Sequence, residues 1–523
     1  MIKPNKIVIV GGGSAGWMTA ATLIKTFPDK DITLIESANT PTVGVGESTL
    51  GQINSWMGLI GIKDEEFMAA TDATYKLSIR FDEFYKKGGG HFHYPFGTPD
   101  FNGTHFNFND WWFKKKLYPE TQYHDFAEKY FPALTLLNKN KITDKLNQLK
   151  GWNFQTDTAY HFDATKFGLF LKSHHCLNKG VKYIVGDVTD TKVDETGIKE
   201  LILDGSIPVK ADLFIDCTGF KSLLLAGALE EPFESYADFL PNNSAWATKI
   251  KYKNAEKEIV GYTNCHAIEN GWCWEIPLWH RWGTGYVYSD KYVSDEEALV
   301  EFKTHIKKRF PYANAEELEY KNIKMRVGIH NRTWVKNVCA IGLSAGFIEP
   351  LESNGLYTTH EFLFKLVKAL DRDHVNKFDI DAYNMHNKWL FRNFAEFVGL
   401  HYALTGRDDT QYWRDCQARN YASKEMDNLQ VTRLVGFQDA AFNKYHRNEF
   451  NDGGFPCIAA GMHWAPVGGP DAVYNRVWLT EEDHKIMWKK ITENLDKKVG
   501  EWEKMIEDCP TYYDYIKEKF HSD

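Results

Sequence analysis

Cysteine is sparse in this chain of 523 residues, and its eight cysteines are scattered without CxxC spacing. The sequence therefore predicts isolated reduced thiols and no metal site, neither a zinc cluster nor a redox pair. No apolar run approaches the length that spans a membrane, and a strand pattern begins at Ile7, too early for a signal sequence. We expect a cytoplasmic protein with no membrane partner.

Basic residues are outnumbered as well, with 62 Lys and Arg against 71 Asp and Glu and a formal net charge of −9. This balance provides no basic surface, and no Lys/Arg block forms a tail, so we expect no nucleic-acid partner. At 523 residues the chain is long enough for about two to four domain-sized units, and its 43% hydrophobic residues are ample for a core. Aromatic residues reach 15%, including 17 tryptophans, which hints at an aromatic binding site.

A glycine-rich turn occupies residues 11–16. Gly11 permits the tight turn, Gly13 lets the backbone come close to a phosphate, and Gly16 lets the following helix pack closely on the preceding strand. The N-terminus of that helix favours negative charge. The turn therefore predicts a site for a dinucleotide pyrophosphate, although a glycine turn between strand and helix can also serve packing alone.

The surroundings of the turn favour the nucleotide interpretation. Residues 7–10 form a β-branched run, a helical pattern starts near Trp17, and residues 31–36 read as a second strand. That strand ends at Glu36, about 20 residues beyond Gly16, where a ribose-binding carboxylate belongs. A complete strand–helix–strand unit of this kind predicts nucleotide binding.

Three further stretches have open interpretations. Residues 43–49 form a glycine-spaced loop that can approach a cofactor closely or be an ordinary turn. Residues 73–81 alternate apolar and polar side chains and predict one half-buried strand, on which Lys76 taken alone is a surface lysine. Residues 88–97 predict an irregular aromatic loop, either a binding surface or a solvent-facing turn.

Beyond residue 98 the sequence becomes charged and helical or irregular, and we interpret residues 98–150 as an insertion. The nucleotide fold resumes with a segment at 159–163 that leads into a helix and a strand-pair candidate at 181–188. A buried strand at 211–219 resembles the second FAD-contacting strand of flavoprotein oxygenases. No second GxGxxG precedes a helix, because the glycines at 283–285 lead into a strand pattern, and the chain from 361 onward is mostly helical.

The most specific stretch is residues 271–277, Gly-Trp-Cys-Trp-Glu-Ile-Pro, a W-x-W-x-I-P pattern formed by Trp272, Trp274, Ile276 and Pro277. A second block, at 337–356, contains Phe-Ile-Glu-Pro-Leu-Glu-Ser-Asn-Gly-Leu. Together with the glycine fingerprint and the strand around Lys76, these motifs closely resemble the flavin-dependent tryptophan halogenases. The resemblance runs from about residue 5 to Arg414 and is less clear in the last hundred residues.

This resemblance implies an α/β fold with two parts. Residues 1–390 would form an FAD-binding Rossmann-like domain of the flavoprotein monooxygenase type, and residues 391–523 a mostly helical subdomain on the substrate side. Reduced FAD from a separate flavin reductase and O₂ would oxidise chloride, bromide or iodide to hypohalous acid. The acid would pass through a tunnel and halogenate an electron-rich aromatic, either an indole such as tryptophan or a phenol.

The resemblance also assigns residue roles. Lys76 would hydrogen-bond the hypohalous acid or form a haloamine, and Glu352 would orient the oxidant and take a proton from the ring intermediate. For Glu352 the alternative is a carboxylate that satisfies donors at a helix N-terminus. The cofactor contacts are assigned to Gly11, Gly13, Ser14, Ala15, Gly16, Glu36, Val45, Gly46, Glu47, Val188, Leu343 and Leu356.

The halide and the substrate fall where this chain departs from the family. The family holds its halide on two backbone N–H groups, here those of Asn354 and Gly355, and the first position is commonly threonine. Asparagine can add an amide donor and tolerates left-handed backbone, so the preferred halide stays open. The substrate wall would be Tyr94, where tryptophan-specific members have histidine, and Phe96, with Trp464 as a further stacking residue or a core tryptophan.

Two other functions are compatible with a flavin fold. An aromatic hydroxylase would oxygenate its substrate directly, which the W-x-W-x-I-P pattern and Lys76 argue against. A non-catalytic flavin-binding protein would not need both Lys76 and Glu352. The sequence leaves the oligomeric state open, with a homo-oligomer as one option.

Overall fold

The structure, a computed structural model, describes residues 3–39, 46–100, 114–144, 149–372, 374–418, 454–463 and 480–522. Two residues of the expected site, Val45 and Trp464, lie outside these ranges.

A six-stranded sheet carries the glycine-rich turn. Its strands run in the order β20-β21-β12-β1-β2-β8, and β1 lies parallel to both of its neighbours. Because both faces of a parallel sheet are covered, its strands are apolar throughout rather than alternating. The predicted nucleotide unit is confirmed, since β1, α1 (Ser14–Thr26) and β2 follow one another as expected. The strands are β1 (Lys6–Val10), β2 (Asp31–Glu36), β8 (Lys182–Val185), β12 (Leu213–Asp216), β20 (Trp334–Val335) and β21 (Val338–Ala340).

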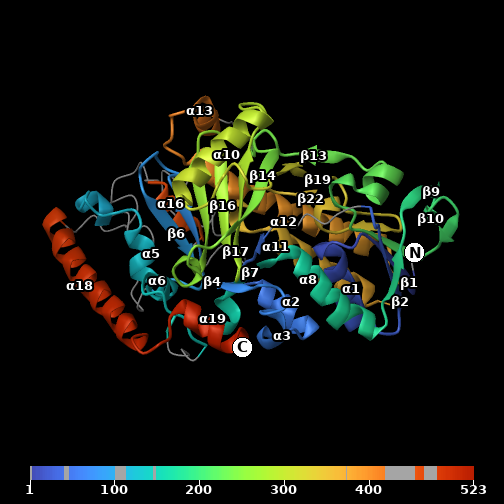
Figure 1. The fold of residues 1–523 in the computed structure, drawn as a ribbon, viewed down its shortest axis with the longest axis horizontal. Coiled ribbons are helices and arrows are strands. Elements are labelled where there is room, and N and C mark those ends of the chain that lie inside the picture. The colour runs from blue at the N-terminus through green and yellow to red at the C-terminus, as the bar shows by residue number, and fades with distance from the viewer. Residues whose placement is uncertain are drawn as a thin grey trace.

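A seven-stranded sheet forms the second large layer, in the order β18-β14-β17-β16-β15-β5-β6. All neighbours are antiparallel except β5 and β15. Helix α10 (Asp295–Arg309) covers one face (Figure 1). Its start follows from a capping box, in which Ser294 and Glu297 satisfy each other's backbone N–H groups. The strands are β5 (Ser78–Asp82), β6 (His91–Pro95), β14 (Ser244–Lys251), β15 (Tyr262–Ile268), β16 (Gly271–Pro277), β17 (Arg281–Tyr288) and β18 (Lys321–Lys324).

A short sheet of three strands, β3-β7-β4, packs beside the seven-stranded sheet. Its strands are β3 (Gly46–Ser48), β7 (Ala159–Asp163) and β4 (Thr74–Lys76). Strand β3 also contacts β16 and β17 of the seven-stranded sheet. The chain therefore passes from the glycine-rich side to the W-x-W-x-I-P side through these three strands.

The prediction of one half-buried strand over 73–81 is wrong. The chain changes sheets at Leu77, so β4 pairs with β7 whereas β5 pairs with β15 and β6. Leu77 itself donates its N–H to the Gly261 carbonyl at 2.7 Å. The alternation of apolar and polar residues continues across Leu77. Nearly every side chain of residues 73–81 is nevertheless buried, because other elements pack on both faces of these strands.

The prediction of an irregular loop over 88–97 is also wrong. His91–Pro95 forms β6, an edge strand that pairs with β5, with Tyr94 opposite Ile79. Glycines at 88–90 suggested a loop, but they only form the turn that leads into the strand. The predicted pair at 181–188 is likewise divided, because β8 belongs to the six-stranded sheet and β9 (Val188–Asp194) to another.

The remaining strands and the helices surround these sheets. Among the described helices, none combines the length and the apolarity needed to cross a membrane. The small sheets contain β10 (Gly197–Leu203) and β11 (Ile207–Val209) beside β9, and β13 (Phe233–Ser235), β19 (Gly328–His330) and β22 (Gly346–Phe347). The α-helices before residue 300, besides α1 and α10, are α2 (Ile53–Ile60), α3 (Asp64–Phe67), α5 (Asp125–Tyr130), α6 (Pro132–Asn138), α7 (Phe154–Asp157), α8 (Ala164–Phe170) and α9 (Ala255–Glu258).

The C-terminal part is mostly helical in the described ranges, as expected. Its helices are α11 (Gly355–Leu370), α12 (Lys377–Ala403), α13 (Gln411–Ala418), α16 (Gly454–Gly461), α18 (Glu481–Met505) and α19 (Tyr512–Phe520). Helix α18 packs on α5 and α6 at one end of the molecule (Figure 1). The expected boundary at residue 390 falls inside the continuous helix α12. The division into residues 1–390 and 391–523 therefore stays a prediction.

The glycines of the turn have different surroundings. Gly11 has a φ of +116°, and a Cβ there would lie 2.2 Å from the Cys217 carbonyl oxygen. A Cβ on Gly16 would lie 1.9 Å from the Gly11 carbonyl oxygen, whereas one on Gly13 would meet nothing within 4 Å. Gly13 is extended, with φ −78° and ψ −176°, a conformation open to alanine. Close packing therefore requires glycine at positions 11 and 16 but does not require it at position 13.

We expect Gly16→Ala to lower the free energy of unfolding by about 2–3 kcal/mol, because the new methyl group meets rigid backbone. Gly13→Ala should cost less than about 1 kcal/mol, the scale of a changed helix N-cap. Urea unfolding of the two variants beside the parent protein measures both values. Equal losses would contradict this division of roles between the two glycines.

Candidate active site

Lys76 lies at the end of β4 with its side chain fully buried, so the surface interpretation is wrong. Its Nζ donates to the Thr49 carbonyl at 2.9 Å and to Ser353 Oγ at 2.7 Å, and lies 5.0 Å from the centre of the Phe96 ring. Burial lowers the pKa of the amine from 10.5 to about 7, against the opposing effect of the Glu352 charge. A neutral amine is therefore present near pH 7.

Buried hydroxyl groups and a histidine extend from Ser353. Its Oγ lies 3.0 Å from Ser48 Oγ, which lies 2.6 Å from Thr263 Oγ1. Thr263 Oγ1 lies 2.9 Å from His161 Nε2, and the other ring nitrogen lies 3.1 Å from Thr74 Oγ1. Burial and then the Lys76 charge hold the pKa of His161 well below 6.5, so the imidazole is neutral. This row of hydrogen bonds orients the hydroxyl that faces Lys76.

Glu352 ends the 3-10 turn η6 (Pro350–Glu352) and is fully buried. Its Oε1 lies 2.8 Å from Nε2 of His401, on α12, but away from the direction in which a ring N–H points. Among the described residues neither carboxylate oxygen has a hydrogen-bond partner. Glu352 therefore does not satisfy donors at the N-terminus of α11, and such an uncompensated buried carboxylate is typical of a functional site.

Asn354 and Gly355 begin α11. Asn354 has φ −82° and ψ −13°, and the left-handed residue is instead Ser353, with φ +58°. The Asn354 side chain donates its amide to the Glu349 carbonyl at 3.0 Å, and no side chain caps the helix N-terminus. A Cβ on Gly355 would meet nothing within 4 Å. The first N–H groups of this 16-residue helix can therefore receive an anion.

The N-terminus of α1 offers a second set of uncapped N–H groups. Gly13 precedes Ser14 and Ala15, and no side chain caps this helix either. A Cβ on Gly342 would lie 2.7 Å from Ala15 Cβ, so the turn that carries Leu343 lies beside the helix N-terminus. Leu343 is 37% exposed. Leu356 is buried on α11, which packs against α1.

Glu36 lies against the glycine turn at the end of β2. A Cβ on Gly12 would lie 2.3 Å from its carboxyl group, and Tyr183 donates to Oε2 at 2.7 Å. Val188 begins β9 close by, since the Gly186 N–H donates to the Glu36 carbonyl at 3.0 Å. With the open approach at Gly13, these residues fit an adenine dinucleotide such as FAD.

Strand β3 lies between the W-x-W-x-I-P strand and Lys76. Gly46 packs against Ile276 of the W-x-W-x-I-P strand, with a Cβ–Cγ2 separation of 3.4 Å if a Cβ were added. Burial and then the Asp163 charge raise the pKa of the half-buried Glu47 to about 7. The next residue is Ser48, a member of the row that reaches Lys76. Gly46 and Ser48 therefore connect the W-x-W-x-I-P strand to the row of hydrogen bonds at Lys76.

Tyr94 and Phe96 follow one another on the lysine side. Their rings meet edge to face with centres 6.0 Å apart, and Tyr94 meets Phe397 of α12 in the same way at 6.3 Å. Phe96 is buried and Tyr94 half-buried. Helix α16 closes on this wall, because a Cβ on Gly454 would lie 3.0 Å from the Tyr94 ring.

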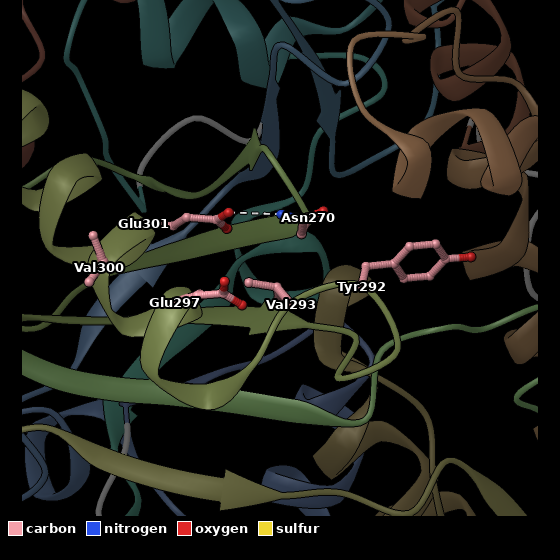
Figure 2. A pocket seen from close by; sticks show the side chains of 6 residues that line it. All are labelled: Asn270, Tyr292, Val293, Glu297, Val300 and Glu301. Carbon is pink, nitrogen blue, oxygen red and sulfur yellow. Dashed lines mark hydrogen bonds between the residues drawn. The ribbon is translucent and has the colours of Figure 1, made fainter.

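A pocket of about 400 Å³ lies elsewhere, on the α10 side of the seven-stranded sheet. In Figure 2, Glu301 and Asn270 face each other through a hydrogen bond at its edge. Trp272 and Trp274 point to the opposite face of the sheet, into the main core. The pocket is therefore separate from the candidate active site. Its lining residues are Asn270, Tyr292, Val293, Glu297, Val300 and Glu301.

Sequence patterns did not indicate His161, His401, Ser48 or Thr263 as members of the site. Each is a common residue type inside an ordinary strand or helix, and the partners in these contacts lie far apart in the chain. In the described ranges no group of three or more His, Cys, Asp and Glu side chains is placed to hold a metal ion. The eight cysteines all lie in the described ranges, and no disulfide joins any two of them.

Comparison with known proteins shows the family of the chain. The family model for tryptophan halogenase matches residues 6–473. The tryptophan 6-halogenase SttH of Streptomyces toxytricini is 36% identical over 434 residues, covering 80% of this chain and 82% of the relative.

Solved structures agree over nearly the whole length. The apo structure of VirX1 superposes with a TM-score of 0.90 and 37% identity, covering 100% of both chains. Tar14, described as a tryptophan C-6 flavin-dependent halogenase from taromycin biosynthesis, has a TM-score of 0.81 and 31% identity over 98% of this chain and 99% of its own. The predicted α/β fold is confirmed. The chain belongs to the tryptophan halogenase family and is a flavin-dependent halogenase.

Proposed function

We propose that this enzyme transfers halogen from hypohalous acid, through Lys76 and Glu352, to an electron-rich aromatic of the tryptophan or indole type. The observation that carries the proposal is a fully buried lysine amine with a pKa near 7, in the field of a buried carboxylate that has no hydrogen bond to any residue the structure describes. SttH and Tar14 are both named as tryptophan halogenases, which supports the substrate class.

The cofactor site would be built from the glycine turn and its neighbours. The N-terminus of α1, with Gly11, Gly13, Ser14, Ala15 and Gly16, would hold the pyrophosphate, and Glu36 would bind a ribose. Gly46, Glu47, Val188, Leu343 and Leu356 would contact the rest. When bound and reduced, FAD would supply the two electrons that bring O₂ to the peroxide level, at which it can oxidise a halide. The sequence contains no second dinucleotide fingerprint, which supports a separate flavin reductase.

The halide would lie on the N–H groups of Asn354 and Gly355. These donors begin α11, a helix of 16 residues without a side-chain cap, and open space surrounds Gly355. A helix N-terminus offers unpaired N–H groups and the positive end of the helix dipole, both favourable to a small anion. Glu352 lies only two residues before Asn354 in the chain.

Lys76 and Glu352 would divide the transfer between them. The neutral amine can accept a hydrogen bond from hypohalous acid, or take its halogen to form an N–halogen bond with loss of water. The Glu352 oxygens, which make no hydrogen bond within the described part of the chain, can orient the oxidant and accept the proton that the ring loses. Thr49 and Ser353 would hold the amine in place.

An aromatic substrate would pack against Tyr94 and Phe96. The Phe96 ring lies 5.0 Å from Lys76 Nζ, so a ring stacked on this wall would be within reach of the amine. The Tyr94 hydroxyl offers a polar edge suited to indoles and phenols. A cytoplasmic location and a homo-oligomer stay predictions.

The direct experiment is incubation with FAD, a flavin reductase, NADH and one halide at a time, over a panel of indoles, including tryptophan, and phenols. We expect products whose mass rises by one halogen atom less one hydrogen, and only when halide is present. A halide-independent gain of one oxygen atom would instead support an aromatic hydroxylase.

Lys76→Met should reduce halogenation more than about tenfold, a loss above ~1.4 kcal/mol in the barrier, because the thioether can neither donate to nor hold the oxidant in the same way. FAD binding and oxidation of reduced FAD should persist, since Lys76 lies apart from the glycine turn. Lys303→Met on α10, where the lysine pairs with Glu316 on the surface, is the control. Retention of more than a tenth of the activity would contradict the role of Lys76.

The pH dependence should show an acid limb near pH 7. Below the pKa of about 7 the amine is protonated and has no lone pair for the halogen, so product formation should fall about tenfold per pH unit. Above that pKa the amine is neutral and the rate should level off. Initial rates of product formation, divided by rates of reduced-FAD oxidation at each pH, measure the effect. A flat ratio between pH 5.5 and 8 would exclude Lys76 as the titrating group.

Asn354→Thr should change the halide preference. Threonine is too short to repeat the amide bond to the Glu349 carbonyl, so the two N–H donors should shift. Competition between chloride and bromide in one reaction should reveal a change in product ratio of roughly threefold, equal to ~0.6 kcal/mol. Asn254→Thr, at the start of α9, is the matched control. An unchanged ratio would mean that this side chain does not shape the halide site.

A further inference from the structure

We propose that Glu349 is a positioning residue that holds the turn bearing Glu352 and Asn354, and that Trp272 of the W-x-W-x-I-P motif acts through it. The inference rests on the proposed function of that turn. It also gives the W-x-W-x-I-P motif a structural role, which neither Lys76 nor the cofactor site explains.

Glu349 directly precedes η6 and is fully buried. Its Oε2 accepts hydrogen bonds from Trp272 Nε1 at 3.0 Å, Asn242 Nδ2 at 2.7 Å and the Tyr402 hydroxyl at 2.7 Å. The donors come from β16, from the segment before β14 and from α12. One carboxylate oxygen therefore joins the seven-stranded sheet to the C-terminal helices.

The donors are themselves held in place. Asn242 Nδ2 also lies 3.0 Å from the Tyr402 hydroxyl, and the Tyr412 hydroxyl of α13 donates to Asn242 Oδ1 at 3.0 Å. Asn242, Tyr402 and Tyr412 are all fully buried. Buried polar groups linked in this way are directional and have no water to replace a lost partner. We call Trp272, Asn242, Tyr402 and Glu349 the Glu349 cluster.

The backbone on the other side of Glu349 closes the turn. Its carbonyl accepts the Asn354 side-chain amide at 3.0 Å, and the Ser353 N–H donates to the Pro350 carbonyl at 3.0 Å. Glu352 lies between these contacts and has no hydrogen bond of its own among the described residues. The turn that carries the Glu352 carboxylate and the Asn354 N–H is therefore held by the contacts of Glu349, together with the 2.8 Å contact between Glu352 and His401.

An indole fits this role better than another aromatic ring. Trp272 packs its rings into the main core while its N–H reaches the carboxylate, which a phenylalanine cannot do. A buried carboxylate that loses one of three donors is left undercompensated and should shift or draw in water. Any such shift of the Glu349 carboxylate moves Glu352 and Asn354 together.

The test compares two deletions of a donor with a matched control. Trp272→Phe and Tyr402→Phe each remove one hydrogen bond to Glu349 and keep an aromatic ring. Trp282→Phe removes an indole N–H bond to another glutamate, Glu258, at 3.2 Å, in the same sheet but on the α10 face. All three lose one indole or hydroxyl donor, but only the first two belong to the Glu349 cluster.

The first measurement does not depend on activity. Hydrogen exchange followed by mass spectrometry should show at least about tenfold faster exchange across residues 350–356 in Trp272→Phe and Tyr402→Phe, with no change in Trp282→Phe. Unaltered exchange in both cluster variants would overturn the inference. Because each variant tests the cluster separately, failure of one to fold leaves the other decisive.

The second measurement is product formed per O₂ consumed. We expect this yield to fall at least about fivefold in the two cluster variants and the KM for halide to rise, while the rate of reduced-FAD oxidation and the unfolding midpoint stay close to those of Trp282→Phe. The double variant should lose less than the product of the two single losses, because both act through one oxygen. Yield and unfolding midpoint equal to those of Trp282→Phe would overturn the positioning role.

The two proposals fail in different ways. If the parent enzyme makes no halogenated product with any halide, the proposed function fails, and the exchange measurement still decides whether Glu349 holds the turn. If the parent enzyme halogenates and Trp272→Phe does so with equal yield and protection, only the present inference fails.

Discussion

The burial of Lys76 is the constraint on which the rest of the site depends. A primary amine taken out of water loses the hydration that favours its charged form, and here it receives only a carbonyl and a hydroxyl in return. Its pKa consequently falls to about 7. This one amine is enclosed by the three-stranded sheet, by the row of hydrogen bonds from Ser48 to His161 and by the Phe96 ring. Together these elements keep water away from the amine and hold it in one orientation.

Two regions of the molecule meet at this amine. The parallel sheet offers an uncapped helix N-terminus for a dinucleotide, and the mixed seven-stranded sheet offers aromatic side chains. Strand β3 packs on the seven-stranded sheet through Gly46, and through Ser48 it belongs to the row of hydrogen bonds that ends at Lys76. A separation of this kind suits an enzyme that would generate an oxidant at one place and use it at another.

The two carboxylates of this turn, Glu349 and Glu352, have opposite hydrogen-bond surroundings. Glu349 receives three donors at one oxygen, whereas Glu352, three residues later, has none among the described residues. Several donors on one oxygen hold a carboxylate rigidly, whereas a buried carboxylate without such donors costs free energy and is typical of a functional site. The contrast explains how a short turn can be both well ordered and chemically available, and it gives the W-x-W-x-I-P tryptophan a place in the site without contact to substrate.

The sequence by itself determined the glycine turn, β1, α1, β2 with Glu36, the helical C-terminal pattern and, through the motifs, the family with Lys76 and Glu352. These features are local, since a glycine's φ and a side-chain period are decided by neighbours within a few residues. Only the tertiary structure decided that the chain changes sheets at Leu77, that His91–Pro95 is a strand, that Ser353 and not Asn354 is left-handed, and that Lys76 is buried. The contacts of Lys76 with Ser353, of Glu352 with His401 and of Glu349 with Trp272 join distant segments. Such contacts arise from the packing of whole sheets and helices, which no short stretch of sequence contains.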